Sequence, residues 1–397
     1  MADNQREALT FAVSDGELER RWKAVRTRMK EERIDALVMQ DTNEWLGGYV
    51  KWFTDIPARN GYPMGVIFPV DDLMTTITPG GKPPSDLGPP AWTLRGVKSR
   101  LTAPYFPSLN YSNTYDADLV VQTLTDRKKG RIGIIGKGRI SIAFYEHLVK
   151  NMPGATFVDA TDFVDEIKAV KSAEEIDLIK KTCALQDEAM EWAKTIIKPG
   201  RKDFEIVADV VHKVTMLGSE EQLVIAGSGP LGKPTPMQKR HFQGRTLREN
   251  ESFTLMIEVN GPGGMYAELG RIFFTGKVPA ELFDAYELCK ETQQVTLNLL
   301  KPGADPKAIW DANNEFLVRR GLPPETRLYA HGQGCDLVER PAIRDDEPMK
   351  LKADMNITVH PTVGSDRLWV WVCDNYLVTE KGASPCLHKI PQQIFSV

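Results

Sequence analysis

A capped helix start near residue 172 separates two stretches of the chain that have different patterns of strands and helices. Ser172 and Glu175 form a capping box, and a long amphipathic segment follows them. Ahead of this segment, short apolar strands alternate with helical stretches, as along residues 131–151, which is typical of an α/β domain. Behind it, strands rich in β-branched and aromatic residues predominate. The sequence therefore predicts an α/β domain over residues 1–165 and an α+β domain over residues 166–397.

The charge balance and the apolar runs exclude two classes of partner. The chain has 397 residues, with 50 Lys and Arg against 54 Asp and Glu, and a formal net charge of -4. It therefore offers no basic field to attract nucleic acid or anionic lipid. Apolar runs such as residues 36–39 are far too short to span a bilayer. We expect neither nucleic acid nor a membrane as a partner.

The N-terminal residues and the cysteines indicate a reducing compartment. Residues 1–7 contain neither the basic region nor the apolar region of a secretory signal. The 5 cysteines are an odd number, lie far apart and include no CxxC pair, which argues against a disulfide framework or a zinc ribbon. The sequence therefore predicts a cytoplasmic protein.

Two carboxylates lie on either side of a glycine-rich turn in the second domain. Glu258 is near the end of an apolar strand, and residues 261–264 form the turn. Glu268 follows on the returning segment, shortly before Arg271. Because a tight turn returns the chain alongside itself, we expect the two carboxylates on adjacent strands.

Further ligand-type side chains occur on later β-segments. His331 stands beside two glycines, His360 lies within a predicted strand over residues 356–363, and Cys373 and Asp374 end a final strand. Each histidine alone could be a hydrogen-bonded core residue. Carboxylates and histidines that arrive from several separate segments are, however, what a divalent cation needs. The set predicts an active site, and we expect His331 to lie within hydrogen-bond or coordination reach of Glu268.

Along nearly its whole length the sequence resembles the creatinase, aminopeptidase P and prolidase family. The blocks that carry the resemblance are residues 167–176, 271–276, 331–334, 339–341 and 377–382. The resemblance implies a creatinase-type α/β N-terminal domain followed by an α+β catalytic domain with the pita-bread fold.

The ligand positions of the family are altered in this sequence. The resemblance implies two metals held by two aspartates, one histidine and two glutamates in the peptidase members. A dinuclear site needs bridging carboxylates, so these changes disfavour ordinary prolidase chemistry. In chain order, the corresponding positions hold Met256 or Glu258, then Glu268, His331, His360 and the pair Cys373–Asp374.

Two kinds of site remain open. One is a single Fe, Mn or Zn ion, held by Glu258, Glu268, His331, His360 and either Asp374 or Cys373. The other is a metal-free site in the manner of creatinase. There His331 or His360 would act as the base, with Glu258 and Glu268 as partners.

His241 is a further catalytic candidate. It precedes the strand that carries Glu258, where family members often have a substrate-contacting or catalytic histidine. The run Lys239–His241 is equally typical of a basic surface loop.

Aromatic residues and one arginine are candidates for substrate binding. Members of the resembled family commonly place the small domain of one subunit over the active site of its partner. An aromatic loop between two strands could therefore wall the pocket of a homodimer, and Trp and Tyr faces attract cationic groups such as guanidinium or sulfonium. Core packing or a dimer interface is the alternative role. The candidates are Trp45, Tyr49, Trp52, Phe53, Trp369, Trp371 and Arg271.

Together these features predict a cytoplasmic, homodimeric hydrolase that cleaves a C–N bond in a small molecule. Three alternatives stay open: a metal-assisted lyase of the dimethylsulfoniopropionate-cleaving type, an Xaa-Pro peptidase, and an inactive binding protein on the same fold. The sequence does not name the substrate, because specificity depends on the shape of the pocket.

Overall fold

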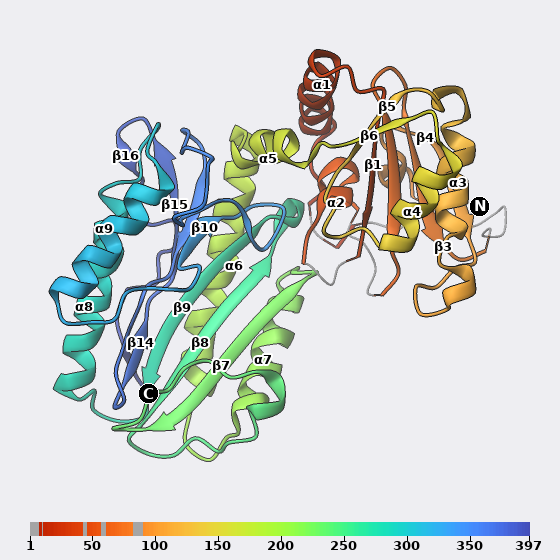
Figure 1. Ribbon diagram of the computed structural model, residues 1–397. Helices are drawn as coiled ribbons and strands as arrows, with labels where there is room; N and C mark the ends of the chain where they lie inside the picture. Colours follow the sequence, from red (N-terminus) through yellow and green to blue (C-terminus); the bar gives the residue numbers. More distant parts are fainter. Residues whose placement is uncertain (1–7, 10, 43–45, 57–60, 82–89) are drawn as a thin grey trace. The chain divides into compact units, whose positions relative to one another are not determined.

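The computed structural model describes residues 8–9, 11–42, 46–56, 61–81 and 90–397 (Figure 1). They form two compact units, Met1–Lys168 and Ala169–Val397. The first is α/β and the second α+β, which confirms the predicted fold class. Within the described residues, no helix has the length and apolar character needed to cross a membrane.

The first unit is built on a six-stranded sheet. The strands run in the order β4-β3-β2-β1-β5-β6, with β1 antiparallel to β2 and parallel to β5. Apolar side chains of α3 and α4 pack on one face of this sheet, as Val120 and Phe144 do against Val38. The elements are α1 (Asp15–Glu31), β1 (Ala36–Asp41), α2 (Tyr49–Thr54), β2 (Met64–Pro69), β3 (Met74–Pro79), β4 (Val97–Ala103), α3 (Tyr115–Thr123), β5 (Arg131–Ile134), α4 (Ile142–Asn151), β6 (Thr156–Asp159) and α5 (Thr161–Ala169).

The aromatic segment expected as an exposed loop contains the buried helix α2. Trp52 is 1% exposed and Phe53 is fully buried. The Phe53 ring contacts the Phe68 ring edge-on at 5.0 Å, and the Arg21 guanidinium lies 5.3 Å from the Trp52 ring. The prediction that Trp52 and Phe53 overhang another subunit's site is therefore wrong, because both side chains are used within their own unit.

Tyr49 is also buried in the first unit. Its hydroxyl donates a 2.8 Å hydrogen bond to Asp165, and the ammonium of Lys168 lies 4.5 Å from its ring. Tyr49 is therefore committed to contacts within this unit. Trp45, the remaining member of the predicted aromatic loop, lies outside the described residues.

Replacing Trp52 with phenylalanine should destabilise the first unit by about 1–3 kcal/mol, because the smaller ring leaves a void in a packed core. Urea unfolding followed by circular dichroism measures the change. Tyr111→Phe is the control, since Tyr111 is 75% exposed and should unfold as wild type does. Wild-type stability of Trp52→Phe would contradict the core assignment.

The second unit has helices packed on two main sheets. Its elements are α6 (Ala173–Ile196), α7 (Asp203–Met216), β7 (Gln222–Pro230), β8 (Glu251–Asn260), β9 (Tyr266–Phe274), α8 (Ala280–Leu297), α9 (Pro306–Arg319), β10 (Ala330–Gly332), β11 (Glu339–Ala342), β12 (Asn356–Val359), β13 (Thr362–Gly364), β14 (Trp369–Trp371), β15 (Asp374–Thr379), β16 (Gly382–Ala383) and β17 (Phe395–Ser396). The sheet orders are β17-β9-β8-β7 and β11-β10-β12-β15-β16, with β13 and β14 as a separate pair. Figure 1 shows α6 and α7 along the first sheet and α8 and α9 beside the second.

The start of this unit follows the sequence closely. Ser172 accepts a hydrogen bond from the backbone of Glu175 and completes the predicted capping box at the start of α6. Residues of α6 and α7, such as Ala189 and Val210, then pack against Leu255 of β8. This packing holds β8 and β9 in place, and these two strands carry the predicted carboxylates.

Two predicted strands are interrupted where the site residues lie. β12 ends at Val359 and β13 begins at Thr362, so His360 lies between strands and not inside one. Pro361 has no backbone N–H to continue the ladder. Likewise, β14 ends at Trp371 and β15 begins at Asp374, so Cys373 lies in the gap and does not end a strand.

Candidate active site

The two predicted carboxylates face each other across adjacent strands. Glu258 of β8 is paired in register with Glu268 of β9, and the side chains are only 4% and 3% exposed. Burial raises the pKa of Glu258 well above its usual value, and the nearby Glu268 raises it further. Burial also raises the pKa of Glu268, to about 7, although hydrogen bonds from Cys373 and Thr358 oppose the shift. Two buried carboxyl groups this close resist ionising together, so the pair as a whole favours retaining a proton.

His331 points a ring nitrogen at Glu268. It lies on β10, where Nδ1 donates a 2.8 Å hydrogen bond to the carbonyl of Gly332. This bond fixes the tautomer, so that Nε2 presents its lone pair. Nε2 lies 3.8 Å from Oε2 of Glu268, which confirms the expected proximity. Burial lowers the pKa of His331 to about 4, and the ring is neutral at physiological pH.

His360 approaches the same oxygen from another segment. Its Nε2 lies 3.9 Å from Oε2 of Glu268, and its ring meets that of His331 edge-on at 5.3 Å. Burial lowers the pKa of His360 well below its usual value, and His331 and Arg327 lower it further. Within the described part of the chain, this buried Nε2 has no hydrogen-bond partner. A buried nitrogen without a partner is costly unless something binds it.

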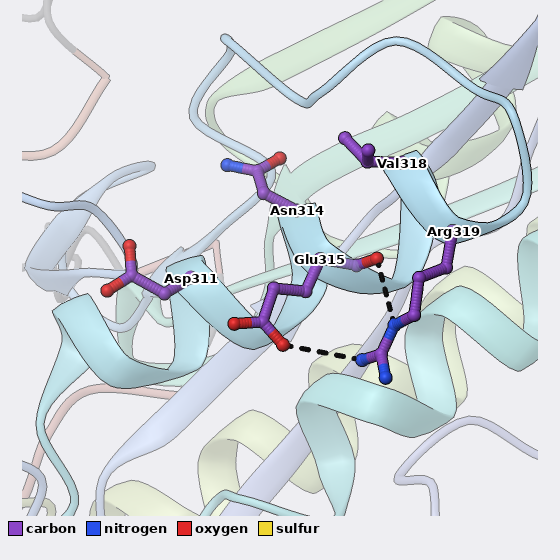
Figure 2. Close-up of a pocket in the computed structure, with 5 residues that line it drawn as sticks. All are labelled: Asp311, Asn314, Glu315, Val318 and Arg319. Carbon is purple, nitrogen blue, oxygen red and sulfur yellow. Dashed lines mark hydrogen bonds and ion pairs between the residues drawn. The ribbon is translucent and has the colours of Figure 1, made fainter.

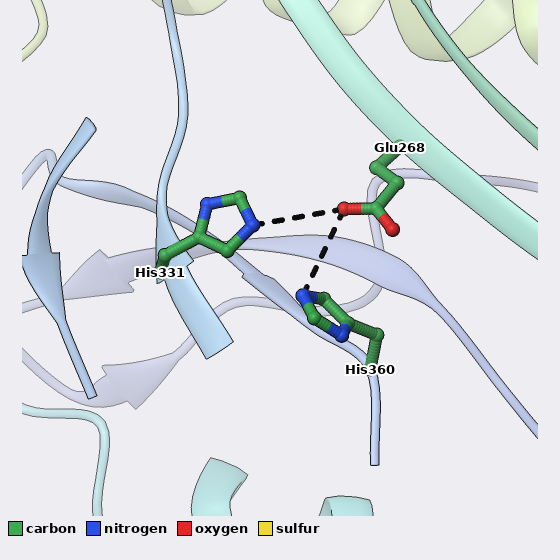
Figure 3. Close-up of side chains that lie close together, drawn as sticks. All are labelled: Glu268, His331 and His360. Carbon is green, nitrogen blue, oxygen red and sulfur yellow. Dashed lines mark ion pairs between the residues drawn. The ribbon is translucent and has the colours of Figure 1, made fainter. Parts of the chain in front are cut away.

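These three side chains fit one divalent ion. One ligand atom from each of Glu268, His331 and His360 lies within 4.8 Å of the others, and Figure 3 shows the two Nε2 atoms directed at the carboxylate. Ligands placed about 2.1 Å from a tetrahedral ion would be about 3.4 Å apart, so only a small contraction is needed. Two neutral imidazoles and one carboxylate suit Zn²⁺ or Fe²⁺ and leave coordination positions open.

The other residues expected as ligands lie outside this three-residue group. Oε1 of Glu258 accepts a 2.9 Å hydrogen bond from Gln333. Cys373 keeps its proton, because burial and the nearby Glu268 raise the pKa of the thiol well above its usual value. Its Sγ donates to the backbone carbonyl of Glu268 at 3.5 Å. Glu258 and Cys373 therefore border the three-residue group.

Asp374 and Arg271 form a separate buried ion pair, which corrects two predictions. Both side chains are fully buried, and two guanidinium nitrogens of Arg271 donate to the Asp374 carboxylate at 2.7 and 3.1 Å. Side chains alternate along an extended strand, so Asp374 points away from its neighbours Cys373 and Asn375. Cys386 and His388 also lie near Asp374, but Arg271 already occupies its oxygens. Asp374 is therefore not available to bind the predicted ion, and Arg271 is not available to bind a substrate.

The remaining candidates lie in different surroundings. His241 is exposed on a short turn, with its ring tilted against that of Phe242, so the structure does not bring it to the buried carboxylates. Trp371 is 1% exposed, stacks on Trp369 at 6.3 Å and belongs to the apolar cluster that includes Cys373. This cluster borders the carboxylates through the contact of Cys373 with Glu268.

A surface hollow along α9 is not part of this site (Figure 2). Its lining comes from the exposed side of one helix, and Arg319 is engaged there by Glu315 of the preceding turn. No histidine or cysteine is among its lining residues, which are Asp311, Asn314, Glu315, Val318 and Arg319.

Sequence reasoning missed three amides that support the carboxylates. Gln333, Asn356 and Asn375 are buried and hydrogen-bonded to one another, and Asn375 accepts from the backbone N–H of Glu268 at 2.8 Å. Their spacing in the sequence could have identified two of them, because Gln333 follows His331 by two residues and Asn375 follows Cys373 by two. On a strand, such spacing places side chains on one face.

Comparison with known proteins decides the family. Residues 177–380 match the profile of metallopeptidase family M24. The chain belongs to this family. As its description says, the family is one of metallopeptidases.

Individual relatives of the M24 chain are distant in sequence. It is 26% identical over 243 residues to a probable dipeptidase PepE of Mycobacterium tuberculosis, covering 60% of this chain and 64% of that protein. The chain thus spans less than two thirds of the length of that relative. It is 23% identical over 409 residues to an ectoine hydrolase of Halomonas elongata, covering 95% and 96% of the two chains.

A solved structure supports the fold. The X-Pro aminopeptidase from Thermotoga maritima matches with a TM-score of 0.77 at 18% sequence identity, over 95% of this chain and 99% of that one. At this level of identity the match shows a shared fold and not a shared substrate.

Proposed function

We propose that this M24 protein is a hydrolase that cleaves a C–N bond in a small, non-peptide molecule, with one divalent ion held by Glu268, His331 and His360. The observation that carries the proposal is the convergence of two neutral imidazoles on one buried carboxylate. A bound ion would act as a Lewis acid. It would lower the pKa of a water molecule bound to it toward neutral pH, so that hydroxide could form there.

The chain's own residues supply orientation and a proton. The carbonyl of Gly332 fixes the tautomer of His331, and the backbone N–H of Glu268 is held by Asn375. Hydrolysis of a C–N bond requires a proton on the departing nitrogen. Glu258 is buried beside the ion ligands, and burial together with the nearby Glu268 raises its pKa and favours its protonated form, so it is the general acid in this proposal.

A small substrate is supported by two further features. An apolar cluster of Met256, Trp369 and Trp371 lies beside Cys373, and the ring of Trp369, which is only partly buried, suits a compact cationic or amidine group. The match to the ectoine hydrolase, whose name describes a hydrolase of a small molecule, extends over nearly the whole chain. The match to the probable dipeptidase covers a smaller share of the chain.

Purified protein loaded with Mn²⁺ or Zn²⁺ should hydrolyse a small C–N compound and should release no proline from Xaa-Pro dipeptides. A suitable panel is ectoine, creatine and a small N-acylated amine, with mass spectrometry used to detect the gain of one water. The matched control is His331→Ala, which should be inactive on every compound. Rapid Mn²⁺-dependent release of proline would contradict the proposal and would favour a peptidase.

A further inference from the structure

Gln333 directs an amide N–H at the carboxyl group of Glu258. The side chain is fully buried, and Nε2 donates to Oε1 of Glu258 at 2.9 Å and to the carbonyl of Leu337 at 3.1 Å. A side-chain amide has donors only on its nitrogen. The orientation of this amide therefore decides whether Glu258 meets a donor or an acceptor.

The surrounding hydrogen bonds fix that orientation. The backbone N–H of Glu268 can only donate, and it donates to Oδ1 of Asn375 at 2.8 Å. Nδ2 of Asn375 must then be the group that donates to Oε1 of Gln333, at 2.9 Å. Nε2 of Gln333 is left facing Glu258, and the Leu337 carbonyl, which can only accept, requires the same orientation.

A donor in this position competes with a cation for Glu258. The N–H carries a partial positive charge, which repels a cation, and it occupies one of the two lone pairs of Oε1. Glu268 is paired in register with Glu258 on the adjacent strand. Two paired carboxylates on β8 and β9 would otherwise suit a second ion next to the first.

We propose that Gln333 limits the site to one divalent ion by presenting an N–H to Glu258 where a second ion would bind. This inference rests on the proposed function, which places the first ion at Glu268, His331 and His360. Gln333 is thus a positioning residue that limits the number of ions that the site binds.

Titration of chelator-treated protein with Mn²⁺, by isothermal calorimetry and elemental analysis, tests the proposal. Wild type should bind one ion per chain. Gln333→Glu should bind two, because the substitution replaces the donor with a carboxylate that faces Glu258. The matched control is Asn356→Asp, which makes the same chemical change in an amide that donates to the Gln333 backbone carbonyl, and it should still bind one ion.

Every outcome decides the question. Two ions in wild type, or one in a folded Gln333→Glu protein, would overturn the role of Gln333 and leave the hydrolase proposal standing. No ion in wild type would instead contradict the proposed ion site, and this inference with it. If Gln333→Glu does not fold by circular dichroism, Gln333→Leu removes the donor without adding charge. That variant should bind a second ion about 10–100-fold more weakly than the first, and a single ion would overturn the proposal.

Discussion

Replacing Arg271 with leucine is expected to destabilise the protein by about 3–5 kcal/mol, because it leaves the Asp374 carboxylate buried without its cation. Arg271 is fully buried and also donates to the backbone carbonyls of Cys373, Ile390 and Pro391. It therefore ties the C-terminal segment to β9. Chemical denaturation at neutral pH measures the loss.

The pH dependence of this loss has a defined sign. Burial would raise the pKa of Asp374, but Arg271 and the nearby His388 lower it to about 2. In wild type the ionised carboxylate therefore stabilises the fold above the unfolded pKa of about 3.9, and this contribution is lost as pH falls toward 2. In Arg271→Leu, burial without the cation would raise the pKa, so ionised Asp374 destabilises the fold at neutral pH. The difference in the free energy of unfolding between wild type and Arg271→Leu should therefore become smaller below about pH 4.

An exposed arginine provides the matched control. Arg367 pairs with Glu281 at the surface, and its side chain is 62% exposed. Arg367→Leu should unfold as wild type does at every pH, because solvent screens such pairs. Equal effects of Arg271→Leu and Arg367→Leu would show that the buried pair is not important for stability.

Replacing His360 with alanine is expected to weaken binding of the ion and to lower kcat, each by at least about 100-fold. Loss of a group that only supports a ligand typically costs 10–100-fold, and loss of a ligand itself should exceed this. The fold should survive, since His360 lies between strands and its Nε2 forms no hydrogen bond within the described residues. Calorimetric titration with Zn²⁺ and turnover of the C–N substrate measure the two effects.

The control for His360→Ala is another buried histidine of the same unit. His388 lies beside Asp374 and pairs with Gln186 at 2.9 Å, away from the three-residue group. His388→Gln should keep its ion and its turnover. Full ion affinity in His360→Ala would remove His360 from the site and would favour a different ligand set.

Features determined by local sequence could be predicted. The capping box of Ser172 and Glu175 depends on residues three apart. The pairing of Glu258 with Glu268 depends on one glycine-rich turn, which brings the strands together directly. The proximity of His331 to Glu268 required more, namely the resemblance to a known fold.

Features determined by tertiary packing could not be predicted. The glycines and aromatic residues around Tyr49–Thr54 indicate a loop, and only packing against Phe68 shows that they form a buried helix. Cys373 and Asp374 are neighbours in the sequence, and both are residue types that can bind a metal. Which of the two side chains points toward Glu268 depends on where β15 begins. The bond between Gln333 and Glu258 joins amino acids 75 positions apart and has no sequence signature.

The most direct test of the central claim is a crystal structure of the metal-loaded protein, with anomalous diffraction recorded at the absorption edge of the added ion. The proposal predicts one anomalous peak per chain, bonded to Oε2 of Glu268 and to Nε2 of His331 and His360. Glu258 should remain hydrogen-bonded to Gln333 and should make no bond to the ion. Two peaks between β8 and β9, a peak at Asp374, or no peak near Glu268 in loaded protein would contradict the proposal.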